Sequence, residues 1–266
     1  MRKITAAAFF VVLAFTAFAQ ADDWSKTYDL TGKPELRVAA WDANVRIEPW
    51  DQNKIEAHVT THGWHIGGGG DGLEIVEHQN GNAVEIELRP RHRVHFSISV
   101  ESHRTELEIR MPRSAKVDVR SEDGSILARG LQGELDFSSG DGKLQLEDVD
   151  GSLHARTSDG SVRVSGRFDV VDLHTSDGRV ELEARPGSQL RQSWQVRTSD
   201  GSVQLRIPAD LAADLELHTG DGRITTNIPI AVQGSFDREH IRGKMNGGGN
   251  LLSVHTSDGS ITLDKF

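Results

Sequence analysis

The sequence lacks cysteine entirely, and only 6% of its 266 residues are aromatic. Without cysteine the chain cannot form a disulfide framework, a thiolate metal site, a cysteine nucleophile or a lipidated cysteine anchor. Gly-x-Ser-x-Gly, His-Glu-x-x-His and Walker-type spacings are also missing, which gives no support to the enzyme classes that use them. Hydrophobic residues make up 36% of the chain, enough for a core, so wholesale disorder is excluded.

Long hydrophobic runs are missing too, apart from the one between Ile4 and Ala19. Arg2 and Lys3 precede this run, and a small-residue A-x-A pattern ends it, which is the layout of a secretory signal. The run is shorter than the roughly 20 residues of a membrane span. Residues 1–21 are therefore predicted to be a cleaved signal peptide, and no membrane span is expected after cleavage.

Positive charge is scarce relative to negative charge. Removing Arg2 and Lys3 leaves 28 basic and 40 acidic residues, a formal charge of −12 for the mature chain. An acidic chain is not attracted to DNA, RNA or an anionic membrane, so no nucleic-acid partner is predicted. The signal places the protein outside the cytoplasm, in the periplasm or at the cell surface.

Glycine is the residue in excess, at 27 copies or about 10% of the chain against roughly 7% in an average protein. Seven of these glycines end a recurring motif of Ser or Thr, a variable residue, Asp and Gly. They are Gly124, Gly142, Gly160, Gly178, Gly201, Gly222 and Gly259. The first three intervals are 18 residues each, and the last is 37. Because 37 is close to twice 18, a degenerate turn is expected between Arg223 and Leu252.

Apolar residues alternate with polar ones on both sides of each motif. In the Gly160 repeat the apolar positions are Leu153, Ala155, Val162 and Val164, and the same columns are apolar in nearly every copy. The one Trp in the regular repeats, Trp194, falls in such an inward column. A period of two on each side of a turn predicts half-buried strands and an all-β fold.

Two topologies fit this pattern. Asp-Gly between alternating strands is a hairpin signal and would give an antiparallel β-meander. The rival is a single-chain β-solenoid of about 18-residue coils, in which equivalent residues stack on their copies in the next coil. A hairpin would oppose Arg156 to Arg163, and the spacing is regular, so the solenoid is favoured. Residues 22–115 lack the motif and are predicted to form an irregular β N-terminal lobe or cap, and residues 116–266 the repeat solenoid.

The chain resembles a family of bacterial exported β-strand repeat proteins, adhesin-like chains grouped as domain of unknown function 4097. The likeness lies in Val45-Arg-Ile-Glu-Pro-Trp-Asp51, in the repeated Thr-Ser-Asp-Gly-Ser-Val, and in the closing stretch from Ile241 to Ile261. It spans nearly all of the mature chain. The resemblance implies a β-solenoid in the cell envelope and supplies no catalytic residues.

The Asp of each motif is the first candidate for a binding group. The seven are Asp123, Asp141, Asp159, Asp177, Asp200, Asp221 and Asp258. In a solenoid they would form a ladder at about 4.8 Å, which could hold a row of cations such as Ca²⁺. The favoured interpretation is structural: each Asp accepts hydrogen bonds from its own turn, and the following Gly supplies a positive φ. No metal or other cofactor is therefore predicted.

Two polar columns point outward before each turn. The basic column holds Arg120, Ser138, Arg156, His174, Arg197, His218 and His255, and the acidic one Asp118, Asp136, His154, Asp172, Gln195, Glu216 and Ser253. They form either a groove for an acidic polymer or, the favoured interpretation, a solvated face of compensating charges. Two histidine groups, His58, His62 and His65 and also His92, His95 and His103, have a helical spacing that a strand does not gather, so a metal site is not predicted there.

Three classes of function remain. The favoured class is a non-enzymatic structural, adhesin-like or protein-interaction module of the cell envelope, with an envelope protein or surface glycan as partner. The alternative is a polysaccharide-binding or polysaccharide-cleaving β-helix protein, in which Asp pairs serve as acid and base. The third is a signalling accessory, which no residue pattern supports.

Overall fold

The computed structural model describes residues 21–266 apart from 64, 68–71 and 92–103, and every element in the described part is a β-strand. The all-β prediction is thus confirmed. The first strands are β1 (Ala21–Asp29), β2 (Glu35–Ala40), β3 (Ala43–Trp50), β4 (Lys54–His62), β5 (Leu73–Asn80), β6 (Ala83–Pro90), β7 (Arg104–Pro112), β8 (Ser114–Ser121), β9 (Ile126–Arg129) and β10 (Gln132–Ser138). The others are β11 (Leu144–Arg156), β12 (Val162–His174), β13 (Val180–Ala184), β14 (Trp194–Arg197), β15 (Val203–Ile207), β16 (Ala213–Thr219), β17 (Ile224–Thr226), β18 (Ala231–Phe236), β19 (His240–Met245), β20 (Leu251–Thr256) and β21 (Ile261–Lys265).

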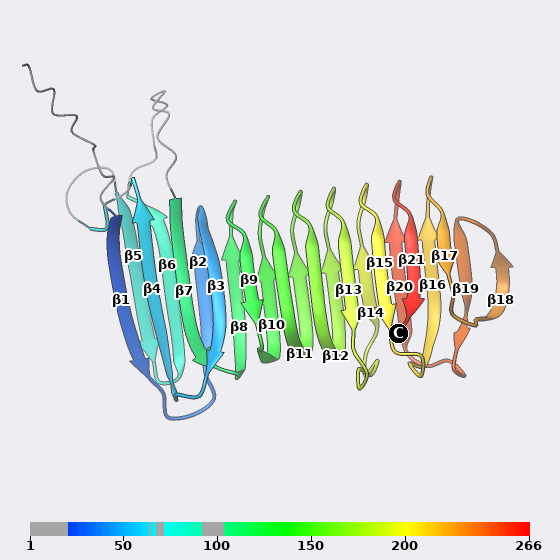
Figure 1. Cartoon of the computed structure of the whole chain (residues 1–266), viewed down its shortest axis with the longest axis horizontal. Helices are drawn as coiled ribbons and strands as arrows, with labels where there is room; N and C mark the ends of the chain where they lie inside the picture. The colour runs from blue at the N-terminus through cyan, green and yellow to red at the C-terminus, as the bar shows by residue number, and fades with distance from the viewer. Residues whose placement is uncertain (1–20, 64, 68–71, 92–103) are drawn as a thin grey trace, which may run out of the picture.

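The strands of the repeats form two facing walls, connected by the Asp-Gly turns. Wall A holds the strands before the turns, such as β8, β10 and β14, and wall B those after them, such as β9, β13 and β15. The long strands β11 and β12 pair first in wall B and then in wall A. Figure 1 shows the result as an elongated stack.

Neighbouring repeats pair in parallel and in register. In wall A, Leu135 lies opposite Leu153, and Leu153 opposite Val171. In wall B, Leu144 lies opposite Val162, and Val162 opposite Val180. Equivalent residues therefore stack on one another at 18-residue offsets, a pairing that differs from the antiparallel meander.

The order of the repeats in space is not their order in the sequence. β20 lies between β14 and β16 in wall A, and β21 lies between β15 and β17 in wall B. The last repeat is thus inserted between the two that precede it, which Figure 1 shows as red strands between yellow and orange ones. The other end has a similar insertion. There β2 lies between β6 and β8 in wall A, and β3 lies between β7 and β9 in wall B.

Antiparallel strands flank the stack at both ends. β4 pairs with β7 and β1, β5 pairs with β6, and at the far end β19 pairs with β16 and β18. The degenerate turn expected between Arg223 and Leu252 is therefore wrong, because that segment forms the β18–β19 hairpin. Ala21 begins β1, and the rest of the predicted signal peptide lies outside the described residues. The division at residue 115 stays a prediction.

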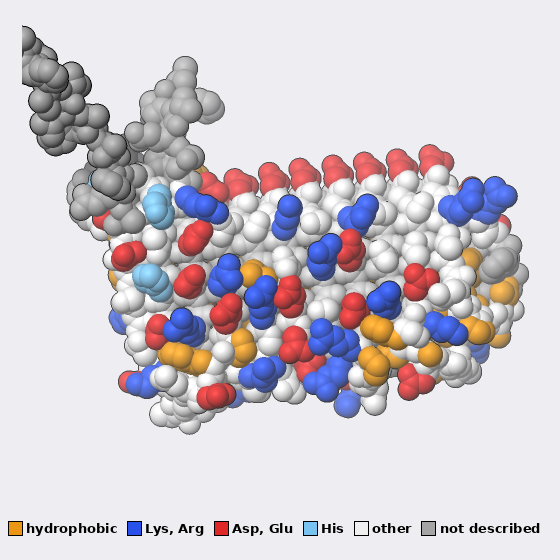
Figure 2. Space-filling model, in the orientation of Figure 1, with side chains coloured by type: hydrophobic (Ala, Val, Ile, Leu, Met, Phe, Trp, Pro, Cys, Tyr) orange, Lys and Arg blue, Asp and Glu red, His pale blue; other side chains and the backbone are white. Residues whose placement is uncertain are grey.

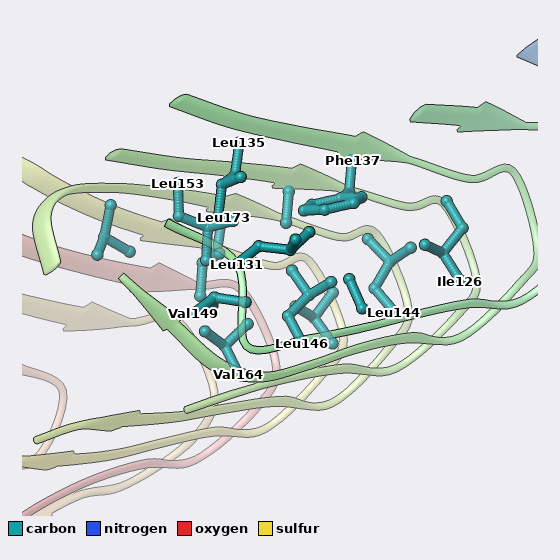
Figure 3. Close-up of a cluster of buried hydrophobic side chains, with 14 of the residues drawn as sticks. Ile126, Leu131, Leu135, Phe137, Leu144, Leu146, Val149, Leu153, Val164 and Leu173 are labelled. Carbon is teal, nitrogen blue, oxygen red and sulfur yellow. The ribbon is translucent and has the colours of Figure 1, made fainter. Parts of the chain in front are cut away.

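The core lies between the two walls, where the alternating apolar columns meet. Figure 3 shows Leu135, Phe137 and Leu153 from wall A facing Leu144, Leu146 and Val164 from wall B. Each buried side chain of this size contributes roughly 1.5–3 kcal/mol on burial. Trp194 is fully buried, as its column predicts, and packs edge-on against Phe168 with ring centres 6.3 Å apart. Outward positions are left to polar side chains, which make up the candidate site.

Candidate functional site

The turns bring neighbouring repeats closest together at the motif glycines. A Cβ on Gly178 would lie 1.9 Å from the carbonyl oxygen of Gly160, and a Cβ on Gly201 would lie 1.9 Å from that of Gly178. The described glycines with positive φ include none of the seven motif glycines. The prediction that these glycines supply a positive φ is therefore wrong. Glycine is needed because the backbone of the neighbouring repeat occupies the space that a side chain at this position would fill.

A buried hydroxyl joins each turn to its neighbour. The Thr175 hydroxyl accepts a hydrogen bond from the Gly178 amide at 3.2 Å and donates to the Gly160 carbonyl oxygen at 3.2 Å. The equivalent side chains are buried as well: Ser121, Ser139, Thr157, Thr198, Thr219 and Thr256. In six of the seven motif turns the hydroxyl accepts a hydrogen bond from the motif glycine amide, so these turns do not need the Asp carboxylate for it.

The seven motif Asp side chains form an exposed row along the turns, and Figure 2 shows acidic groups lined up on this edge. Among the described residues, none of the seven carboxylates accepts a hydrogen bond or forms an ion pair. The expectation that each Asp accepts hydrogen bonds from its own turn is thus wrong, because the Ser or Thr hydroxyl takes that role. No three acidic or histidine side chains in the described part of the chain are placed to hold a metal ion.

The structure has an eighth turn of the same kind, which no Asp-Gly motif marks. Asp42-Ala43 connects β2 to β3, and a Cβ on Gly124 would lie 1.9 Å from the Ala43 carbonyl oxygen, as between any two motif turns. Alanine is tolerated because Ala43 pairs on its other side with Thr105 of β7, which belongs to no Asp-Gly turn. The signal that could have found it is Asn44-Val45-Arg46-Ile47, which alternates like Ser161-Val162-Arg163-Val164.

The two polar columns of wall A compensate one another over its first half. Arg120 forms two hydrogen bonds of 3.1 Å to Asp118, and Arg156 lies 3.0 Å from Asp172. Burial raises the pKa of Asp136, and the nearby Asp118 carboxylate raises it further. This part of the face agrees with the compensating-charge interpretation.

The second half of the basic column gathers histidines. The rings of His218 and His255 stack with centres 5.0 Å apart, and His240 of β19 meets His218 edge-on at 5.8 Å. Burial lowers the pKa of His255, and the neighbouring His218 and Arg197 lower it further.

The other histidine candidates are not brought together. His65 lies 3.0 Å from Asp22, and His58 lies 3.7 Å from Asp23, so each has its own carboxylate on β1. His62 pairs with Ala21 at the end of β4. His92, His95 and His103 lie outside the described residues.

A small depression on wall A gathers unlike groups at the Asp42 turn. Its floor is Ala39, which pairs with Glu87 on one side and Arg120 on the other. Other repeats carry Arg, His or Ser in the Ala39 column, so the short side chain opens the surface there. Trp41 lines the depression beside the Asp42 turn and is 36% exposed. Alignment of the repeats could have indicated Ala39 and Trp41, because each differs in size from the residues at the same position in the other repeats.

The fold and these turns define an all-β strand-repeat protein. A family model, Toastrack DUF4097, matches residues 95–190 and 168–264, and the chain belongs to this family. No curated protein matches the chain. Within the described residues, no helix has the length and apolar character to cross a membrane.

The chain is similar in structure to several solved bacterial proteins, at low identity. One is described as a "putative cell adhesion protein" from Clostridium sporogenes: 12% identity, TM-score 0.43, covering 93% of this chain and 100% of that one. Another is a "putative adhesin" from Parabacteroides distasonis: 12% identity, TM-score 0.34, covering 93% and 98%. A third is a "putative adhesin" from Bacteroides fragilis: 8% identity, TM-score 0.32, covering 92% and 97%.

Proposed function

We propose that this chain is an exported β-solenoid of the cell envelope that binds a partner through its outer surface and catalyses no reaction. Parallel pairing at 18-residue offsets supports the solenoid, with residues 22–115 as its irregular N-terminal cap. The signal-like residues 1–21 support export to the periplasm or cell surface.

The exposed Asp row is the observation that carries this proposal. Neighbouring carboxylates about 4.8 Å apart repel by about 0.9 kcal/mol in bulk water, and no described residue neutralises them. Since the hydroxyls already bind the turn amides, the carboxylates add nothing to the turn that would offset this repulsion. A partner with a basic surface would offset this repulsion, and such a partner would meet a regular line of negative charges.

The same row argues against catalysis. Glycoside hydrolysis needs one pair of carboxyl groups facing each other across a bound sugar. Here a single Asp recurs at every turn along an exposed edge. A repeated surface group suits binding to an extended partner, whereas a catalytic pair is formed once.

A photocrosslinker in the row tests the proposal in cells. p-Benzoylphenylalanine at Ser176, beside Asp177, is expected to yield a discrete adduct with an envelope component. The same group at the exposed Gln79 of β5, away from the row, is the control. An adduct from Gln79 alone, or from neither position, would overturn the proposal.

A further inference from the structure

We propose that the depression between Ala39 and Trp41 binds one ring of a neutral hexopyranose oligosaccharide. The inference rests on the proposed function, because it names one ligand of the same binding module. It concerns wall A at the Asp42 turn, a different surface from the Asp row.

Trp41 provides the apolar half of this site. At its position in the turn the other repeats carry Glu122, Gly140, Ser158, Ser176, Ser199, Gly220 or Ser257. Its backbone is fixed on both sides, because its amide donates to Leu88 at 3.2 Å and its carbonyl oxygen accepts from the Glu122 amide at 2.9 Å. A large side chain that breaks a repeat pattern while remaining exposed is a mark of function. The exposed indole on this fixed backbone offers a flat apolar surface to the C–H face of a sugar ring.

Oriented polar groups line the rest of the depression. Asp118 holds the Arg120 guanidinium through two hydrogen bonds of 3.1 Å, while Glu74 holds Arg89 at 3.0 Å. Each guanidinium carries five N–H donors, so both keep donors beyond these contacts. Glu87 and Glu122 add carboxylate acceptors to the lining. Sugar hydroxyls both donate and accept hydrogen bonds, which suits this mixture.

The balance of charge favours a neutral sugar. Two arginines and two glutamates line the depression, so the lining has no net charge. The Asp row begins at Asp123, next to Glu122 of the lining, and the whole chain carries −10. An acidic sugar would approach against this field.

Fluorine NMR on the full exported chain labelled with 5-fluorotryptophan tests the inference. The Trp41 signal is assigned as the one missing in Trp41→Phe. Cellohexaose and chitohexaose, each titrated to about 10 mM, are the neutral probes. Either is expected to shift the Trp41 signal and to leave that of the buried Trp194 unchanged. An absence of any shift with both would overturn the inference.

Two variants separate binding from folding. Ala39→Arg places on the floor of the depression the same side chain that Arg120 has at the paired position of β8. This variant should weaken binding about tenfold or more. Thr225→Arg adds the same charge to the exposed surface of β17 in wall B and should leave binding unchanged. Equal affinities for both variants would contradict the proposed site.

Two further probes decide the class of ligand. Oligogalacturonate, an acidic sugar, and an extended neutral peptide are not expected to shift the Trp41 signal. A shift with either of them in place of the neutral sugars would overturn the inference. If the sugars fail while the Ser176 adduct still forms, this inference falls and the proposed function stands.

Discussion

A Cβ added to Gly142 would lie 2.1 Å from the carbonyl oxygen of Gly124, the equivalent residue of the neighbouring repeat. Close approach of this kind recurs from turn to turn, at the spacing that the strand ladders impose. The motif glycine therefore permits this spacing at the turns and does not shape the turn by positive φ.

Replacing this glycine tests the explanation. Gly142→Ala must move one backbone away from the other, so we expect the free energy of unfolding to fall by at least about 2 kcal/mol in urea denaturation. Gly249→Ala is the control, because its nearest atom would be 3.3 Å away and its φ is not in the positive region. Equal losses for the two variants would contradict the account.

The buried hydroxyls give a second prediction. Thr175→Val keeps the shape of the side chain but leaves the Gly178 amide without its acceptor, which should cost about 1–3 kcal/mol. Thr175→Ser should retain most of the stability, because Ser121 and Ser139 fill the same position in other turns. The check is chemical denaturation of both variants, and a Thr175→Val protein as stable as the parent would contradict it.

Acid should weaken the far end of the stack. The folded pKa of His255 is lowered from 6.5, so the unfolded chain takes up the proton first. Stability is therefore complete above pH 6.5, falls as the pH drops through 6.5, and levels off below the folded pKa. The groups around His255 are Arg197 on β14, His218 on β16, and His240 with Asp237 beyond it.

Thermal melting between about pH 8 and pH 5 measures this effect. His255→Gln should lose less of its melting temperature over that range than the parent does. Identical losses in the two proteins would show that His255 is not responsible.

The inserted position of the last repeat can be tested by disulfides, since the chain has no cysteine of its own. Gln195 and Ser253 are paired residues on adjacent strands, so the double variant Gln195→Cys with Ser253→Cys should form a disulfide under mild oxidation. Gln195→Cys with Glu216→Cys is the control, because β20 separates these strands by about 9.6 Å, beyond disulfide reach. A disulfide in the control pair alone would mean that the repeats stack in sequence order.

The sequence was sufficient to predict the repeat, the all-β class and the buried columns. These follow from local alternation around each Asp-Gly, which every copy repeats, so Trp194 could be placed inside from its column alone. The spatial order could not be predicted, because strands with the same pattern can pair with any copy. The 37-residue interval was therefore interpreted as an extra turn, where the structure has the β18–β19 hairpin.

The candidate site was predicted only in part. The seven Asp residues were found, but their role in the turn was misassigned, because the Ser or Thr hydroxyl two residues before each Asp competes for the same turn amide, and the residue pattern does not show which oxygen accepts it. The Asp42 turn was missed because its glycine is replaced by Ala43. The depression beside Trp41 depends on three strands, β6, β2 and β8, that are distant in sequence, so single-strand patterns do not reveal it.

Binding of the purified chain to envelope fractions, at low salt, tests the central claim that the Asp row is the binding surface. The variant Asp159→Asn, Asp177→Asn, Asp200→Asn neutralises the middle of the row, and Glu108→Gln, Glu134→Gln, Asp210→Asn makes the same change in net charge at exposed positions elsewhere. The account predicts about tenfold weaker binding for the first variant and little change for the second. Equal binding by the two variants would contradict it.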